Sequence, residues 1–101
     1  MKSNKLKTSI DSFQKILTEQ IGMELSHLRK EKGLSGSDLA KKLKISQQQI
    51  SRYENGVNNI SFDKLIILFN ALEMSCRDID VFFEKMKYLF DSSVYKNSKI
   101  E

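Results

Sequence analysis

Four stretches of this chain carry the pattern of a helix start, and together they restrict the fold to a series of short helices. At Ser35, Ser46 and Ser75 a capping serine is followed three residues later by an acid or an amide, and apolar residues stand just before the serine and four residues after it. This pattern is a capping box with a hydrophobic staple. A fourth start, at Ser61, has the staple and lacks only the reciprocal side chain. The starts predict helices over residues 36–43, 47–55, 62–73 and 77–90.

A longer helix is expected ahead of these four. Its apolar residues recur every three or four positions and form one stripe, at Ile10, Phe13, Leu17, Ile21, Leu25 and Leu28. The stripe predicts a helix over residues 9–32, either unbroken or divided near residues 18–22, and Gly33 should end it. The chain has no proline, only four glycines and few alternating apolar runs. We therefore expect an all-α fold of five or six helices.

A chain of 101 residues is long enough for one small domain. We expect residues 19–90 to form this domain, with residues 1–18 as a basic arm and helical extension. Residues 91–101 are rich in Ser, Lys and Asn, and we expect a disordered tail there.

Several classes of protein are excluded by what the sequence lacks. One cysteine, Cys76, and one histidine, His27, cannot make an internal disulfide or a metal site of the usual ligand count. We expect Cys76 to be a small packing residue and His27 to lie at or near the surface. The carboxylates are scattered, so no enzyme is expected and no cofactor. No apolar run reaches the roughly 18 residues of a membrane span, and the Lys-rich start lacks the apolar centre of a secretory signal. These features predict a cytoplasmic protein without membrane contact.

The net charge of +4 is unevenly distributed along the chain. Residues 1–34 carry seven Lys/Arg and four Asp/Glu, residues 35–60 four and two, and residues 61–101 six and seven. The positive excess is therefore N-terminal and central. Such a basic region suits a polyanionic partner, although a charge of this size also serves solubility alone.

The predicted helices over 36–43 and 47–55 have the dimensions of a helix-turn-helix, in which the second helix enters a DNA major groove. With about 100° of rotation per residue, Tyr53 and Glu54 fall on the core side together with Ile50. The opposite face is entirely hydrogen-bonding and consists of Gln48, Ser51, Arg52 and Asn55.

Two segments carry a family resemblance, Gly33-Leu34-Ser35-Gly36-Ser37-Asp38-Leu39-Ala40 and Ser46-Gln47-Gln48-Gln49-Ile50-Ser51-Arg52-Tyr53-Glu54-Asn55-Gly56. They resemble the Cro/phage-repressor (XRE-type) helix-turn-helix family of bacterial and phage transcription regulators over about residues 20–75. The resemblance implies a lambda-repressor-like bundle that binds double-stranded DNA. The run from Gln47 to Glu54 also resembles regulators encoded with fimbrial operons of enteric bacteria, which couple adhesion to repression of motility.

The resemblance implies base contacts from the positions of Gln47, Gln48 and Arg52. A primary amide matches the N6 and N7 edge of adenine, and a guanidinium can fork onto guanine O6 and N7 or clamp a phosphate. The alternative is that the glutamines are good helix formers facing water, and for Gln49 a capping role at Ser46 is favoured. The resemblance also implies an ion pair between Arg29 and Glu54, since related repressors join an arginine near the end of helix 1 to the glutamate that closes the recognition helix.

Phosphate contacts are expected from the start of the helix at 36–43 and from the loop after the recognition helix, where free N–H groups favour anions. The candidates are Ser35, Gly36, Ser37, Asn55 and Asn58, although capping alone explains Ser35. Two positions depart from the family: Gly36 stands where many relatives carry a polar side chain, and Lys44 stands where glycine is common. A positive φ at Lys44 would cost on the order of 1 kcal/mol.

The helix at 77–90 carries more apolar surface than one core-facing stripe needs. Either the N-terminal stripe of the same chain covers it, or a second copy does, because two-fold proteins present two recognition helices to neighbouring half-sites. We expect a homodimer, with these candidates for its contacts: Val81, Phe82, Met86, Tyr88 and Leu89. Two other functions stay open. One is an antitoxin-like protein that binds a toxin partner and represses its own operon, and the other is a helical adaptor that does not bind DNA.

Overall fold

The structure is a computed structural model that describes residues 2–91, with side chains described for residues 10–89. Within this part of the chain there are five helices and no strand: α1 (Lys2–Glu31), α2 (Gly36–Leu43), α3 (Gln47–Glu54), α4 (Phe62–Ala71) and α5 (Cys76–Asp91). The predicted all-α fold is confirmed, and the helix starts agree with the serine pattern to within one residue. The expected tail over 91–101 lies, apart from Asp91, outside the described residues.

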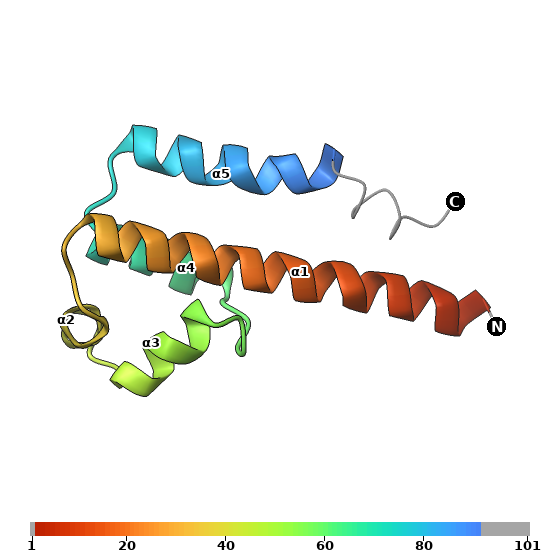
Figure 1. Ribbon diagram of the computed structural model, residues 1–101, viewed down its shortest axis with the longest axis horizontal. Helices are drawn as coiled ribbons and strands as arrows, with labels where there is room; N and C mark the ends of the chain where they lie inside the picture. Colours follow the sequence, from red (N-terminus) through yellow and green to blue (C-terminus); the bar gives the residue numbers. More distant parts are fainter. Residues whose placement is uncertain (1, 92–101) are drawn as a thin grey trace.

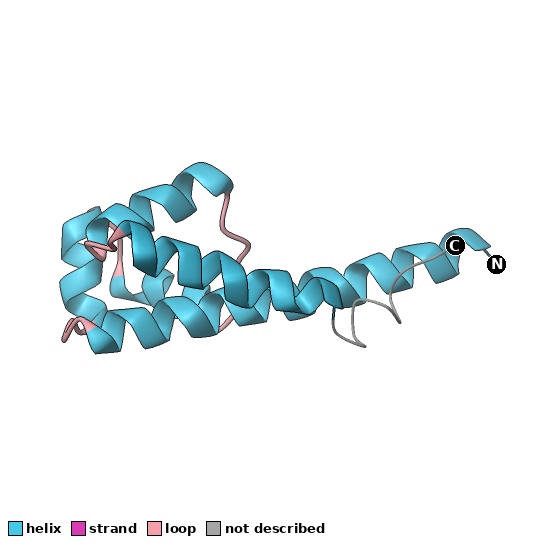
Figure 2. Ribbon diagram, turned by 90° about the horizontal axis from the view of Figure 1, so that it is seen from above, coloured by secondary structure: helices cyan, strands magenta, loops and turns pink. Residues whose placement is uncertain are grey.

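The long first helix is unbroken, which decides between the two arrangements left open by the sequence. Its 30 residues at 1.5 Å each give about 45 Å. α5 runs along one side of α1, while α2 and α3 lie on the other side (Figure 1). The N-terminal turns of α1 project beyond the rest of the bundle (Figure 2). No helix among residues 2–91 combines the length and the apolar character needed to cross a membrane.

Gly22 lies within the segment where a break was one of two possibilities, and its role is close packing. A Cβ atom at this position would lie 2.4 Å from the Tyr53 carbonyl oxygen and 2.7 Å from that of Glu54. The absent side chain therefore lets α1 approach the backbone at the end of α3. Gly33 ends α1 as predicted, with a φ of +73° and its N–H donated to the Lys30 carbonyl.

The predicted caps form at all four serines. At Ser35 and at Ser75 both halves of the capping box are present: the serine hydroxyl accepts from the backbone N–H of Asp38 or Asp78, and that aspartate accepts from the serine N–H. Ser46 accepts from the Gln49 N–H and Ser61 from the Lys64 N–H. The backbone N–H of Ser35 lowers the pKa of Asp38, and the N–H of Ser75, together with Lys32, lowers the pKa of Asp78.

The core is one cluster to which every helix contributes. Its buried apolar residues are Leu25, Leu39, Ala40, Ile50, Leu65, Leu68, Phe69, Leu72, Phe82 and Met86. Phe69 of α4 meets Phe82 of α5 edge to face, with ring centroids 5.0 Å apart. Leu17 and Ile21 pack against this cluster from α1. The C-terminal helix is therefore covered in part by its own chain.

Three expectations for the C-terminal helix are wrong. Phe82 and Met86, proposed as dimer contacts, are 1% and 7% exposed and belong to the core of their own chain. They fill the space between α5 and its neighbours, so a second copy cannot reach them. Cys76, expected to pack inside, is exposed at the first position of α5. Of the other dimer candidates, Val81 and Tyr88 are exposed and Leu89 is half-buried.

Candidate nucleic-acid interface

The turn between α2 and α3 is made by a lysine in a left-handed conformation. Lys44 has φ 57° and ψ 42°, and its N–H is donated to the carbonyls of Ala40 and Lys41 at the end of α2. The Ile45 N–H also returns to Ala40, at 3.1 Å. These bonds hold a conformation that costs a residue with a Cβ on the order of 1 kcal/mol. They set the direction in which α3 leaves the turn.

α3 is divided into a buried face and a solvent face, as its sequence predicts. Ile50 is 2% exposed and anchors the helix, while Tyr53 and Glu54 are half-buried. The exposed set consists of Gln47, Gln48, Ser51, Arg52 and Asn55. α3 lies on the side of α1 away from α5 (Figure 1). The solvent face of α3 thus presents amides, a hydroxyl and a guanidinium with no apolar side chain among them.

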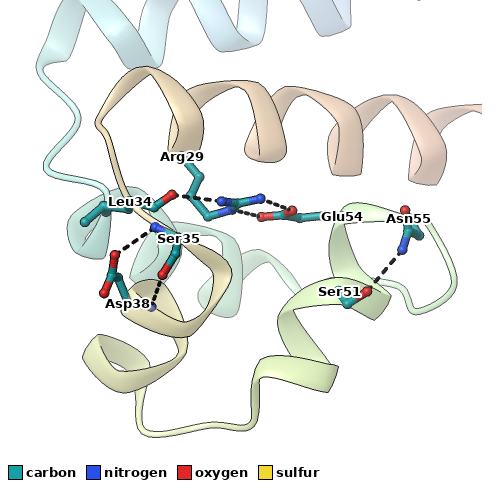
Figure 3. Close-up of polar contacts among 7 residues, drawn as sticks. All are labelled: Arg29, Leu34, Ser35, Asp38, Ser51, Glu54 and Asn55. Atoms are coloured by element: carbon teal, nitrogen blue, oxygen red, sulfur yellow. Dashed lines mark hydrogen bonds and ion pairs between the residues drawn. The ribbon is translucent and has the colours of Figure 1, made fainter.

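The expected pair of Arg29 and Glu54 is present and joins α1 to the end of α3 (Figure 3). Arg29 donates from Nε to Glu54 Oε2 at 2.6 Å and from Nη2 to Oε1 at 2.9 Å, which makes the contact bidentate. A third bond runs from Nη1 to the Leu34 carbonyl at 2.8 Å. The two side chains are only 13% and 10% exposed. The hydrogen bond with Glu54 raises the pKa of Arg29 above its ordinary value, which favours the charged form of the guanidinium.

The loop after α3 holds a contact that sequence reasoning missed. Arg52 donates from Nε to Asn58 Oδ1 at 2.6 Å. Asn58 was expected as a phosphate contact, for which only its Nδ2 group could donate; its amide oxygen accepts from a residue on the solvent face of α3. Asn55 donates from Nδ2 to Ser51 Oγ at 3.2 Å (Figure 3). No sequence pattern signals the Arg52 contact, because it depends on how the chain bends back after Glu54.

The loop itself is anchored on α1. Gly56 has a φ of +70°, and a Cβ there would lie 2.9 Å from Glu19 Cα. Thr18 donates from its hydroxyl to Asn59 Oδ1 at 3.1 Å. The terminal glycine of the Glu-Asn-Gly run is thus required both by its backbone conformation and by a close approach to α1. The Gly22 contact with the end of α3 lies one turn further along the same helix.

The three phosphate candidates at the start of α2 differ in what they can offer. Ser35 is exposed, and its hydroxyl is used in the cap. Gly36 is half-buried, and a Cβ there would lie 3.7 Å from Gln47 Cγ. Ser37 is half-buried as well. The start of α2 and the first residue of α3 are therefore neighbours on one surface. No group of acids, histidines or cysteines placed to hold a metal ion occurs among the described residues.

Comparison with known proteins agrees with this geometry. A family model described as Helix-turn-helix matches residues 25–79, more than half of the chain and all of α2, α3 and α4. The chain belongs to the helix-turn-helix family. Members of this family are DNA-binding regulators of transcription, and the XRE-type resemblance of the sequence is confirmed at that level.

The relatives are regulators and antitoxins. A protein of Rickettsia prowazekii (strain Madrid E) and one of Rickettsia conorii, both named as HTH-type transcriptional regulators, are 36% identical over 86 residues, which is 85% of this chain. The match covers 58% and 61% of those proteins, so this helix-turn-helix chain spans about three fifths of their length. The antitoxin HipB of Escherichia coli K12 is 35% identical over 65 residues, 74% of its length.

Proposed function

We propose that this protein is a sequence-specific regulator of transcription that inserts α3 into the major groove of double-stranded DNA and has no catalytic activity. The observation that carries the proposal is the solvent face of α3, where every exposed side chain can form hydrogen bonds to base edges or phosphates. Membership of the helix-turn-helix family supports it. A regulator of chromosomal genes acts in the cytoplasm, at the nucleoid.

Gln47, Gln48 and Arg52 are assigned to the bases. An amide can pair with the N6 and N7 edge of adenine, and a guanidinium with O6 and N7 of guanine. Gln47 and Gln48 stand in the first turn of α3, which is the end of a recognition helix that contacts base edges. Ser51 lies on the same face and can contact either a base or the backbone.

Phosphate contacts are assigned to the two ends of this surface. Gly36 and Ser37 provide backbone N–H groups at the start of α2, where the helix dipole favours an anion. Ser35 is the third candidate at this helix start, although its own N–H is donated to Asp38. Asn55 provides an amide group after α3, and Asn58, the other candidate in that loop, accepts from Arg52 through its amide oxygen. These contacts hold the protein in register, and with the positive charge of residues 1–60 they make binding fall as salt rises.

The experiment starts from duplexes that the protein itself selects from a random pool. On such a site Gln48→Ala and Arg52→Ala are each expected to lose roughly 1 to 3 kcal/mol of binding free energy, measured by titration at fixed salt. Arg77→Ala is the matched control, because Arg77 is an exposed arginine on α5, away from the proposed surface. Unchanged binding in both variants, with circular dichroism intact, would remove the assigned base contacts, and a failure to select any site would remove sequence-specific binding altogether.

We also propose that the regulator acts as a homodimer, in which Val81, Tyr88 and Leu89 meet their counterparts. Val81 and Tyr88 are 42% and 73% exposed and lie seven residues apart, on one face of α5. A two-fold pair presents two recognition helices to half-sites one helical turn apart.

A second candidate function is that of an antitoxin, which binds a toxin partner and represses its own operon. The observation that favours it is the similarity to two HipB antitoxins over 63% of the chain. Affinity purification of the tagged protein from its own cells tests this candidate, since an antitoxin is recovered with a stoichiometric small protein and a plain regulator is not.

For the genes under control we propose fimbrial and motility genes, on the basis of the eight-residue run from Gln47 to Glu54. Genome-wide mapping of bound DNA tests this assignment. Bound sites that all lie away from such operons would overturn it while leaving DNA binding intact.

A further inference from the structure

The hydrogen bond between Arg52 and Asn58 gives the loop after α3 a role in reading DNA. At 2.6 Å the Nε to Oδ1 distance lies at the short end for such bonds. Arg52 is exposed, so nothing else on the protein surface restrains its long side chain through burial. Its direction therefore depends on where Asn58 is held.

The position of Asn58 is fixed by contacts of the loop residues on either side of it. The N–H groups of Val57 and Asn58 both return to the Arg52 carbonyl, at 2.9 and 3.4 Å, so the loop folds over the last turn of α3. Gly56 is packed against Glu19 of α1, and Asn59 accepts the Thr18 hydroxyl. Asn58 thus lies between two residues that are anchored on α1, and it is half-buried.

The hydrogen bond to Asn58 determines which edge of the Arg52 guanidinium can bind a ligand. The group is planar and carries five N–H donors in a fixed fork. When Nε is bonded to Asn58, the Nη1 and Nη2 edge remains for a ligand, and rotation of the plane is restricted. This edge requires two neighbouring acceptors. In the major groove guanine supplies them as O6 and N7, whereas adenine presents one acceptor beside a donor.

We propose that Asn58 is a positioning residue that orients Arg52 toward guanine, so that part of the sequence preference of the protein is determined by the loop after the recognition helix. The inference rests on the proposed function, because it specifies how the α3 surface selects one base pair. It stands in place of a direct phosphate contact donated by the Nδ2 group of Asn58.

The test is a double-mutant cycle on the duplex that the wild-type protein selects, with each G·C pair of the site exchanged in turn. Asn58→Ala is expected to weaken binding to the selected site roughly 3- to 10-fold, within the range for directly interacting side chains. The loss should be confined to the G·C pair at which Arg52→Ala also loses its preference. In the Arg52→Ala background, Asn58→Ala should have no further effect. Asn70→Ala is the matched control, because Asn70 is an exposed asparagine on α4 and belongs to neither the proposed base contacts nor the proposed phosphate contacts.

Two results would overturn the inference while leaving the proposed function in place. One is that Asn58→Ala binds and discriminates like the wild type. The other is that it weakens binding to every duplex equally and does so in the Arg52→Ala background too, which identifies a phosphate contact. A wild-type protein that binds all duplexes alike would instead overturn the proposed function, and this inference with it. Circular dichroism and the unfolding midpoint establish that each variant is folded.

Discussion

At the scale of single residues, two glycines allow close contacts because they have no side chain. Gly22 leaves room for α3 to end against α1, and Gly56 leaves room for Glu19. At Gly36, by contrast, a Cβ would have only the side chain of Gln47 within 4 Å, at 3.7 Å. The family resemblance singles out Gly36, because many relatives carry a polar side chain there. In the folded protein, however, Gly22 is the position that tolerates a side chain less well.

Gly22→Ala is therefore expected to destabilise the protein strongly. The added methyl group would meet two backbone carbonyls that cannot rotate away, so α1 and α3 must separate. We expect a loss of about 3 kcal/mol in the free energy of unfolding, measured by urea denaturation. Gly36→Ala is the matched control and should change that free energy by less than about 0.5 kcal/mol. Equal stability of the two variants would contradict the close approach of the helices.

At the scale of helices, two kinds of polar contact shape the fold: caps at the helix starts and an ion pair between two helices. The serine caps begin four of the helices. The Arg29 and Glu54 pair connects α1 to the end of α3, close to the surface proposed to read DNA. The angle of the recognition helix therefore depends on a charged contact as well as on the burial of Ile50.

Glu54→Ala should cost about 3 kcal/mol of unfolding free energy, because it leaves the Arg29 guanidinium poorly solvated and without its carboxylate. Glu31→Ala is the control, since Glu31 is 58% exposed and faces an equally exposed histidine, at 3.5 Å. Urea denaturation of both variants measures the difference. Stability retained in Glu54→Ala would mean that the pair contributes orientation alone, and DNA affinity of that variant would then be the relevant readout.

The capping carboxylates predict a loss of stability in acid. The pKa values of Asp38 and Asp78 are lowered in the folded state, so below about pH 4 the unfolded chain binds more protons. Stability should therefore be full above the unfolded pKa and decline as pH falls through the folded pKa. Unfolding curves between pH 2 and pH 6 measure this. In Asp38→Asn and Asp78→Asn the free energy of unfolding should fall less steeply as the pH is lowered. In Asp80→Asn, at a residue that caps no helix, it should fall as in the wild type.

At the scale of the whole molecule, the two sides of α1 serve different purposes. One side carries α2 and α3 with the proposed DNA surface, and the other carries α5 (Figure 1). On α5 the side chains of Val81, Phe83 and Tyr88 are exposed. A dimer through α5 leaves both recognition helices uncovered. Two weak half-site contacts then act together on one operator.

The dimer predicts a mass of twice 11.7 kDa by light scattering at tens of micromolar protein. Tyr88→Glu should shift the mass toward the monomer, because it places two like charges in an apolar interface. Met23→Glu is the control: Met23 is 62% exposed, comparable to Tyr88, and lies on α1. A monomeric wild-type protein, or equal effects of the two substitutions, would argue against the α5 interface.

Much of this protein could be predicted from the sequence because the relevant interactions are local. Caps depend on residues three apart, and the two faces of α3 follow from the helical period, so the starts of α2 to α5 were predicted to within one residue. The exposure of Gln48, Ser51, Arg52 and Asn55 was also predicted correctly. The first helix begins at Lys2, seven residues before its predicted start. The Arg29 and Glu54 pair joins residues 25 positions apart. It was expected from the family resemblance, since no spacing rule connects them.

Tertiary structure alone decided which contacts form between distant segments. An apolar stripe on α5 looks the same whether it meets its own chain or a second copy, and only the packing of α4 and α5 assigned Phe82 and Met86 to the core. The role of Gly22 and the position of Asn58 likewise depend on where α1 passes α3 and the loop that follows it. Local sequence specifies which helices form and which faces they present, while the close approaches between helices depend on the shapes of surfaces that meet only in the folded chain.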